Sequence, residues 1–111
     1  MTVFLMNSKS VFVLDIASSV LNMNAKHIIF IGHVQGVGFR YRAQRIAKEY
    51  QLTGWVKNLP DGSVEMFAQG QPQDVENCIS EIQTSFTGFV RETKINEHPY
   101  NPRYISFIIT Y

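Results

Sequence analysis

Two segments of this chain repeat apolar residues at the spacing of an α-helix, and short runs typical of β-strands lie around and between them. This order constrains the fold more than any other feature of the sequence. The helical segments are residues 39–50, with Phe39, Ala43, Ile46, Ala47 and Tyr50 on one face, and residues 72–86, with Val75, Ile79, Ile82 and Phe86 on one face. Pro72 suits the first turn of the second helix, where the backbone N–H groups have no helical partner.

The strand-like runs complete the order. Runs rich in β-branched and aromatic residues cover 27–31, closed by Gly32, and then 53–59, 63–69, 89–97 and 104–111. The second and third runs flank the turn sequence Pro60-Asp-Gly62, which predicts a hairpin. The order β-α-β-β-α-β-β predicts an α+β fold, a ferredoxin-like sandwich with two helices on one face of a mostly antiparallel sheet. Because this fold carries many unrelated functions, the function has to be argued from a site.

The length allows one domain. The chain has 111 residues, of which 45% are hydrophobic, enough for a single core. Residues 1–24 show no clear period, and a further methionine, Met23, stands near their end. We expect an N-terminal extension over 1–24, disordered or loosely docked, with a short helix over 11–21 as the alternative, and a functional domain over 25–111.

Composition narrows the class of protein. A formal charge of +1 argues against a large nucleic-acid or membrane surface, and no apolar run approaches the roughly 20 residues that span a bilayer. Cys78 is the sole cysteine, which excludes an internal disulfide and a thiolate metal cluster. We expect a cytoplasmic protein that binds neither nucleic acid nor membrane, and no metal site, since His27, His33 and His98 are scattered. His27 and His98 are expected to be structural, and Cys78 a core thiol.

The segment between the first strand and the first helix is rich in glycine. Gly36 and Gly38 would let backbone N–H groups converge on an anion, although a plain strand-to-helix turn needs glycine as well. Arg40 favours the anion, because a cation in the first helical turn opposes the helix dipole and Arg42 repeats that arrangement. Asn58 is unusual within a strand, yet it can simply open the turn at Pro60.

These residues carry a family resemblance. Residues 32–40 (Gly-His-Val-Gln-Gly-Val-Gly-Phe-Arg), 54–58 (Gly-Trp-Val-Lys-Asn), 61–65 (Asp-Gly-Ser-Val-Glu) and Gly70 resemble the acylphosphatase family. The resemblance covers about residues 26–111 and leaves the first 24 residues outside. One departure is His33, where the family more often has arginine or lysine; it makes a local charge depend on pH.

The resemblance implies an activity and a role for each site residue. It implies hydrolysis of acyl phosphates to a carboxylate and inorganic phosphate by a monomeric enzyme without metal or cofactor, with inorganic phosphate as product and competitor. In the family the loop and its arginine hold the phosphoryl group, and the strand asparagine orients the attacking water. These roles fall on the loop residues Val34, Gln35, Gly36, Val37, Gly38 and Phe39, on Arg40, and on Asn58.

The chemistry agrees with these residue types. Phosphoryl transfer passes through a loose transition state, so positioning and charge stabilisation are sufficient. A carboxylate leaving group with a pKa of about 4 needs no general acid, and the sequence places none convincingly at the loop. Two other functions stay open: a domain that processes carbamoyl phosphate within a larger hydrogenase-maturation protein, and an RNA- or anion-binding module. Residues 36–41 resemble an RNA-binding aromatic motif, but that motif belongs on an internal strand.

Overall fold

The structure is a computed structural model that describes residues 22–111. In chain order its elements are β1 (Asn24–Gly32), α2 (Phe39–Glu49), β2 (Thr53–Asn58), β3 (Val64–Gly70), α3 (Pro72–Ser85), β4 (Val90–His98) and β5 (Phe107–Thr110). The alternative helix over 11–21 lies outside the described residues, as does the expected extension apart from residues 22–24. The domain boundary therefore stays a prediction.

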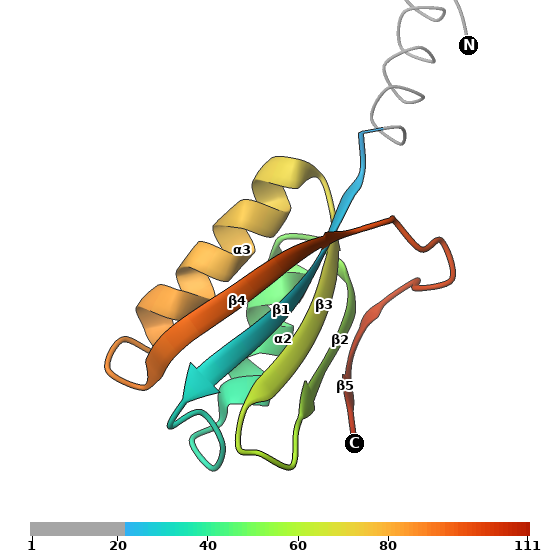
Figure 1. The fold of residues 1–111 in the computed structure, drawn as a ribbon. Helices are drawn as coiled ribbons and strands as arrows, with labels where there is room; N and C mark the ends of the chain where they lie inside the picture. The colour runs from blue at the N-terminus through green and yellow to red at the C-terminus, as the bar shows by residue number, and fades with distance from the viewer. Residues whose placement is uncertain (1–21) are drawn as a thin grey trace, which may run out of the picture.

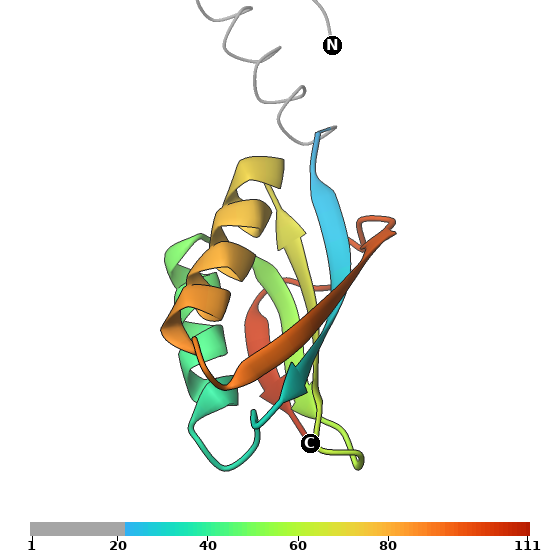
Figure 2. The ribbon, with the colours of Figure 1, turned by 60° about the vertical axis from the view of Figure 1, so that its left-hand side comes forward.

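The strands form one sheet in the order β4-β1-β3-β2-β5. Neighbours pair antiparallel except β2 and β5, which run parallel. Both helices pack on the same face of the sheet (Figure 1), and the side view shows the two layers (Figure 2). The predicted α+β ferredoxin-like sandwich is confirmed.

The core lies between the helices and the sheet. β1, β2, β3 and β5 turn alternate residues toward the helices, as expected from the two-residue repeat of a strand, whereas the residues of β4 are exposed or half-buried. The fully buried core side chains include Ile28, Phe30, Val56, Val64, Met66 and Phe107 from the sheet, and Phe39, Ile46, Val75 and Ile82 from the helices. The apolar faces predicted for both helices are confirmed. No helix within residues 22–111 is long and apolar enough to cross a membrane.

The first and last strands differ from their predicted lengths. The prediction started β1 at His27, but β1 begins at Asn24 because its first residues pair with Gly70 of β3 and His98 of β4. β5 is shorter than predicted and begins at Phe107 rather than Tyr104. It pairs only with β2, opposite Gly54 onward. Residues 104–106 lie outside the strand, although the Ser106 carbonyl still accepts the backbone N–H of Gly54 in β2 at 2.9 Å.

A buried glutamine fixes the connection between β4 and β5. The Gln69 amide nitrogen donates to the Thr53 hydroxyl at 3.0 Å and to the Asn101 carbonyl at 2.7 Å. Its amide oxygen accepts the backbone N–H of Asn101 at 2.9 Å. Gln69 is 0% exposed, so these bonds replace the water that it loses on burial. They hold the turn in place and bring β5 back alongside β2.

The structure shows what lies around Cys78, His27 and His98, the three residues expected to be structural. Cys78 is buried in α3, and burial raises the pKa of its thiol to about 12, so it stays protonated as a core residue. The Nε2 atom of His27 lies 2.7 Å from the Glu65 carboxylate, and its ring lies 5.7 Å from that of His98. Within residues 22–111 no group of three or more His, Cys, Asp or Glu residues is arranged to hold a metal ion.

Candidate active site

The loop between β1 and α2, residues 33–38, is anchored by hydrogen bonds and by a buried side chain. The backbone N–H of His33 donates to the Phe89 carbonyl at 2.8 Å, and the side chain of Val34 is 1% exposed. Gln35 projects the other way, and its amide donates to the carbonyls of Leu59 at 2.7 Å and Ser63 at 2.9 Å. The loop is therefore tied to the core and to the β2–β3 turn, which makes it a preorganised structure.

Two glycines give the loop its shape. Gly36 and Gly38 have φ angles of 78° and 77°, in the left-handed region that favours glycine. A Cβ atom at either position would have no other atom within 4 Å, so the space beside both residues is open. The sequence needs glycine here for the backbone conformation, and the open space admits a ligand close to the backbone.

The N–H groups around this space have no partner within residues 22–111. Among the described residues, no backbone N–H from Val34 to Tyr41 donates to another protein group. Gly38 is the N-cap of α2 and offers no side-chain cap, and the first turn of α2 has no acidic residue. A helix start with free N–H groups and a positive dipole end is an anion site. Arg40 in the same turn adds a full positive charge.

A cavity of about 200 Å³ brings the predicted site residues together. Its walls include all of the predicted residues except Val37, namely Val34, Gln35, Gly36, Gly38, Phe39, Arg40 and Asn58. Val37 instead packs against the core. The motif 36–41 lies on the loop and the first turn of α2, so it is not the strand motif of an RNA-binding module. The loop, the helix start and the end of β2 thus share one cavity.

Asn58 reaches this cavity as the last residue of β2, where it pairs with Val64. The turn that follows is closed by other groups, because Leu59 donates to the Ser63 carbonyl and Asp61 accepts from the backbone and hydroxyl of Ser63. Those bonds lower the pKa of the Asp61 carboxyl. The Asn58 side chain bonds to no other described residue. The turn is complete without it, so its amide is free to bind a ligand or water.

Three further residues line the cavity that sequence reasoning did not single out: Tyr41, Ile109 and Tyr111. The Cζ atom of Arg40 lies 4.8 Å from the centroid of the Tyr111 ring, a cation–π contact. The contact places the positive charge of Arg40 against the face of the ring, at the wall of the cavity. Tyr111 follows β5 directly, so the parallel pairing of β5 with β2 brings this ring beside Arg40.

Known proteins share both the sequence and the fold. The acylphosphatase family model matches residues 26–109. The acylphosphatase of Methanospirillum hungatei is 42% identical over 74 residues, which cover 67% of this chain and 81% of the relative. That of Geobacillus thermodenitrificans is 46% identical over 74 residues, covering 67% and 78%.

Solved structures of related proteins share the fold of this chain. The crystal structure of acylphosphatase from Bacillus subtilis has a TM-score of 0.74 at 34% identity and covers 79% of this chain and 99% of that one. The HypF structure from T. kodakarensis has a TM-score of 0.70 at 33% identity, but the likeness covers only 12% of that chain. With the family model spanning nearly all of the predicted domain, this chain belongs to the acylphosphatase family.

Proposed function

We propose that this acylphosphatase holds the phosphoryl group of its substrate with the loop N–H groups and Arg40, while Asn58 orients the water that attacks phosphorus. The family assignment makes the chain an enzyme that hydrolyses acyl phosphates. The roles of the individual residues are our proposal. The observation that carries it is one cavity lined by Arg40, the loop and Asn58, in which the loop N–H groups and the Asn58 amide have no hydrogen-bond partner among residues 22–111.

The loop and Arg40 suit the charge of the transition state. In phosphoryl transfer that charge spreads over three equatorial oxygens. The N–H groups of residues 34–41 supply fixed dipoles that need no rearrangement during the reaction, which makes them effective in a small cavity. The guanidinium of Arg40 can donate two parallel hydrogen bonds and stays charged near neutral pH.

Asn58 suits the placement of water. An amide accepts through its oxygen and donates through its nitrogen, so it can hold a water molecule in one orientation. A loose transition state asks little of the nucleophile beyond alignment with the leaving group, and a general base is not required. The oxygen of water then bonds to phosphorus as the bond from phosphorus to the carboxylate oxygen breaks, and the protons of the water pass to solvent and phosphate.

The cavity's chemistry also limits the substrate. Within the described residues its walls carry no side chain with a carboxyl, imidazole or thiol group; besides Arg40, its ionisable side chains are Tyr41 and Tyr111, which are 77% and 92% exposed. A phosphomonoester releases an alkoxide, which needs a proton from a well-placed acid. An acyl phosphate releases a carboxylate, which is stable as the anion. We therefore propose that carboxyl–phosphate anhydrides are the substrates and that no metal takes part.

The substrate range provides the first test. The protein is expected to hydrolyse benzoyl phosphate at the same rate in buffer and in excess EDTA, and to hydrolyse para-nitrophenyl phosphate at least about a hundredfold more slowly, because only the monoester needs help for its leaving group. Inorganic phosphate is expected to inhibit competitively, since it offers the same oxygens. Loss of activity in EDTA, or similar rates for the two substrates, would contradict the proposal.

We also propose that the functional domain is the segment 25–111. The family model begins at residue 26, and β1 begins at Asn24. Deleting residues 1–22, which leaves Met23 as the first residue, is expected to preserve the turnover of benzoyl phosphate within about twofold and to leave the urea midpoint nearly unchanged. A truncated protein that aggregates or loses most of its unfolding midpoint would place the boundary elsewhere.

We also propose that the enzyme acts as a monomer in the cytoplasm. The substrate is a small molecule, and the residues that the mechanism uses, the loop, Arg40 and Asn58, all belong to one chain, as a monomeric active form requires. The single cysteine is a free thiol, which supports a reducing compartment such as the cytoplasm. Light scattering during size-exclusion chromatography would report the mass of one chain, 12.7 kDa, or overturn the monomer.

A further inference from the structure

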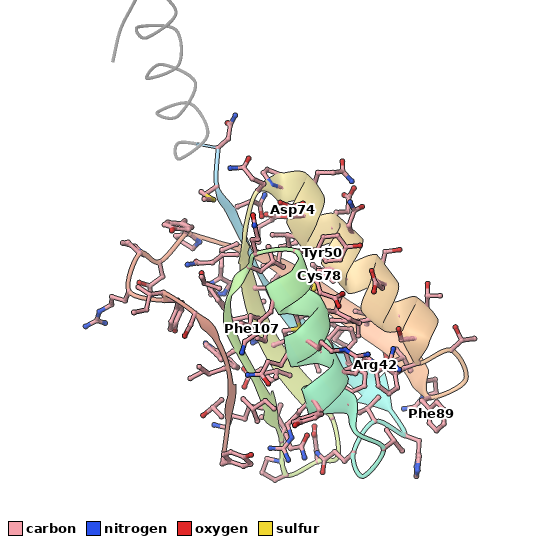
Figure 3. All side chains as sticks on the ribbon, turned by 180° about the vertical axis from the view of Figure 1, so that it is seen from behind. Arg42, Tyr50, Asp74, Cys78, Phe89 and Phe107 are labelled. Carbon is pink, nitrogen blue, oxygen red and sulfur yellow. The ribbon has the colours of Figure 1, made fainter. Side chains whose placement is uncertain are left out.

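The two halves of the proposed site belong to strands that are not neighbours. The loop follows β1 and Asn58 ends β2, and β3 lies between these two strands in the sheet. The loop and the β2–β3 turn nevertheless lie at the same end of the molecule, as Figure 1 and, from the helix side, Figure 3 show. In-line attack needs a precise distance between the phosphoryl group and the water. A contact that fixes the loop relative to the turn would therefore act directly on the rate.

The side chain of Gln35 makes such a contact. Its Nε2 atom donates to the Leu59 carbonyl at 2.7 Å and to the Ser63 carbonyl at 2.9 Å. Among the described residues, no other hydrogen bond joins the loop, residues 33–38, to residues 58–64. One amide group thus links the phosphate loop to the hairpin that carries Asn58.

The two carbonyls stand on either side of the turn, next to Asn58. Leu59 follows Asn58 directly. Ser63 precedes Val64, the residue that pairs with Asn58 across the hairpin. The turn also closes on itself, because the Leu59 N–H donates to the Ser63 carbonyl at 2.9 Å. The turn and the end of β2 therefore form one unit, and the Gln35 amide holds that unit against the loop.

Gln35 lines the catalytic cavity, but its amide nitrogen is already used. A glutamine side chain has two N–H donors, and the two carbonyl partners of Nε2 account for both. The amide has no N–H left for a phosphoryl group, and its oxygen is an acceptor that would repel a phosphate oxygen. The side chain can therefore influence the reaction only through the position of other groups.

We propose that Gln35 is a positioning residue for the attack step: its amide fixes the distance between the phosphate loop and the Asn58 amide, and so aligns the water with phosphorus. This inference rests on the proposed function, because it requires Asn58 to hold the water. It separates the role of the Gln35 side chain from that of the loop N–H groups, which hold phosphate. A displacement of about 1 Å can slow such a reaction by about a hundredfold.

The test removes the Gln35 amide in the presence and in the absence of Asn58. Gln35→Met keeps the length of the side chain but donates no hydrogen bond. It is expected to lower kcat for benzoyl phosphate at least about tenfold and to change the inhibition constant of inorganic phosphate less than about twofold, because the loop N–H groups and Arg40 remain. In the Asn58→Ala background, Gln35→Met is expected to lower the residual turnover less than about twofold, since no amide is left to position.

The matched control is Gln44→Met. The Gln44 amide of α2 donates to the carbonyl of Phe107 in β5 at 3.1 Å. This variant also loses a hydrogen bond from a glutamine to a backbone carbonyl, but it leaves the loop and the β2–β3 turn intact. It is expected to hydrolyse benzoyl phosphate within about twofold of the parent. A loss of turnover confined to Gln35→Met therefore reports a change of position in the site rather than a general loss of stability.

Several results would overturn the proposal. Turnover of folded Gln35→Met within about twofold of the parent would do so, as would an equal loss in Gln44→Met. Weaker inhibition by phosphate, or the same factor of loss in both backgrounds, would show that Gln35 supports the loop itself. If Gln35→Met does not fold, Gln35→Asn, whose amide is one methylene shorter, replaces it under the same criteria. Near-normal turnover in Asn58→Ala would instead refute the proposed function, so the two ideas fail separately.

Discussion

The Arg40→Lys variant is expected to lose at least about a hundredfold in turnover of benzoyl phosphate and to bind inorganic phosphate more weakly, the scale seen when one preorganised donor is removed. Lysine keeps the positive charge but cannot donate two parallel hydrogen bonds from a plane. It also lacks the guanidinium that contacts the Tyr111 ring, whose centroid lies 4.8 Å from the Arg40 Cζ atom. The loss should therefore appear in both binding and rate.

The matched control is Arg42→Lys, two residues along the same helix. Arg42 lies outside the catalytic cavity, so its replacement is expected to leave benzoyl phosphate turnover within about twofold of the parent. Steady-state kinetics and the inhibition constant of phosphate are measured for both variants, after circular dichroism has shown that they are folded. A folded Arg40→Lys protein that binds phosphate and turns over like the parent would refute the role of the guanidinium.

The Asn58→Ala variant is expected to lose turnover by about a hundredfold or more while its inhibition by phosphate changes less than about twofold. The amide is removed from the proposed water position, but the loop and Arg40 remain. Since the Asn58 side chain bonds to no other described residue, the change is expected to cost little stability. Its signature thus differs from that of Arg40→Lys, because the rate falls while the binding of phosphate is preserved.

A suitable control is Asn96→Ala, which removes an exposed asparagine from β4, far along the sheet from the cavity. It is expected to match the parent in both constants. Near-normal turnover in folded Asn58→Ala would end the proposal that this amide places the water. An equal loss of phosphate binding would instead show that Asn58 holds the phosphoryl group.

Much of the fold could be predicted because local patterns and tertiary packing agree. The two helices begin at Phe39 and Pro72 as predicted, since a left-handed Gly38 and a proline mark their starts independently of any partner. The length of a strand depends on its neighbours. β1 gains residues because β3 and β4 continue beside it, whereas Tyr104 and Ile105 have strand-like character but lie opposite no strand. A sequence read alone does not show where a partner ends.

Part of the candidate site could likewise be predicted from the sequence, and part could not. The glycines and Arg40 are adjacent in sequence, so their shared location follows from one loop, and the family resemblance added Asn58. Tyr111 could not be found in this way, because it meets Arg40 only through the parallel pairing of β5 with β2.

The most direct test of the account is where the oxygen of water ends up. Benzoyl phosphate is hydrolysed by the enzyme in water enriched in ¹⁸O, and both products are analysed by mass spectrometry, with the uncatalysed reaction subtracted. If the loop, Arg40 and Asn58 direct water to phosphorus, each turnover places one ¹⁸O atom in inorganic phosphate and none in benzoate. Label in benzoate would show that water attacks the carbonyl carbon, and it would contradict the mechanism proposed for this cavity.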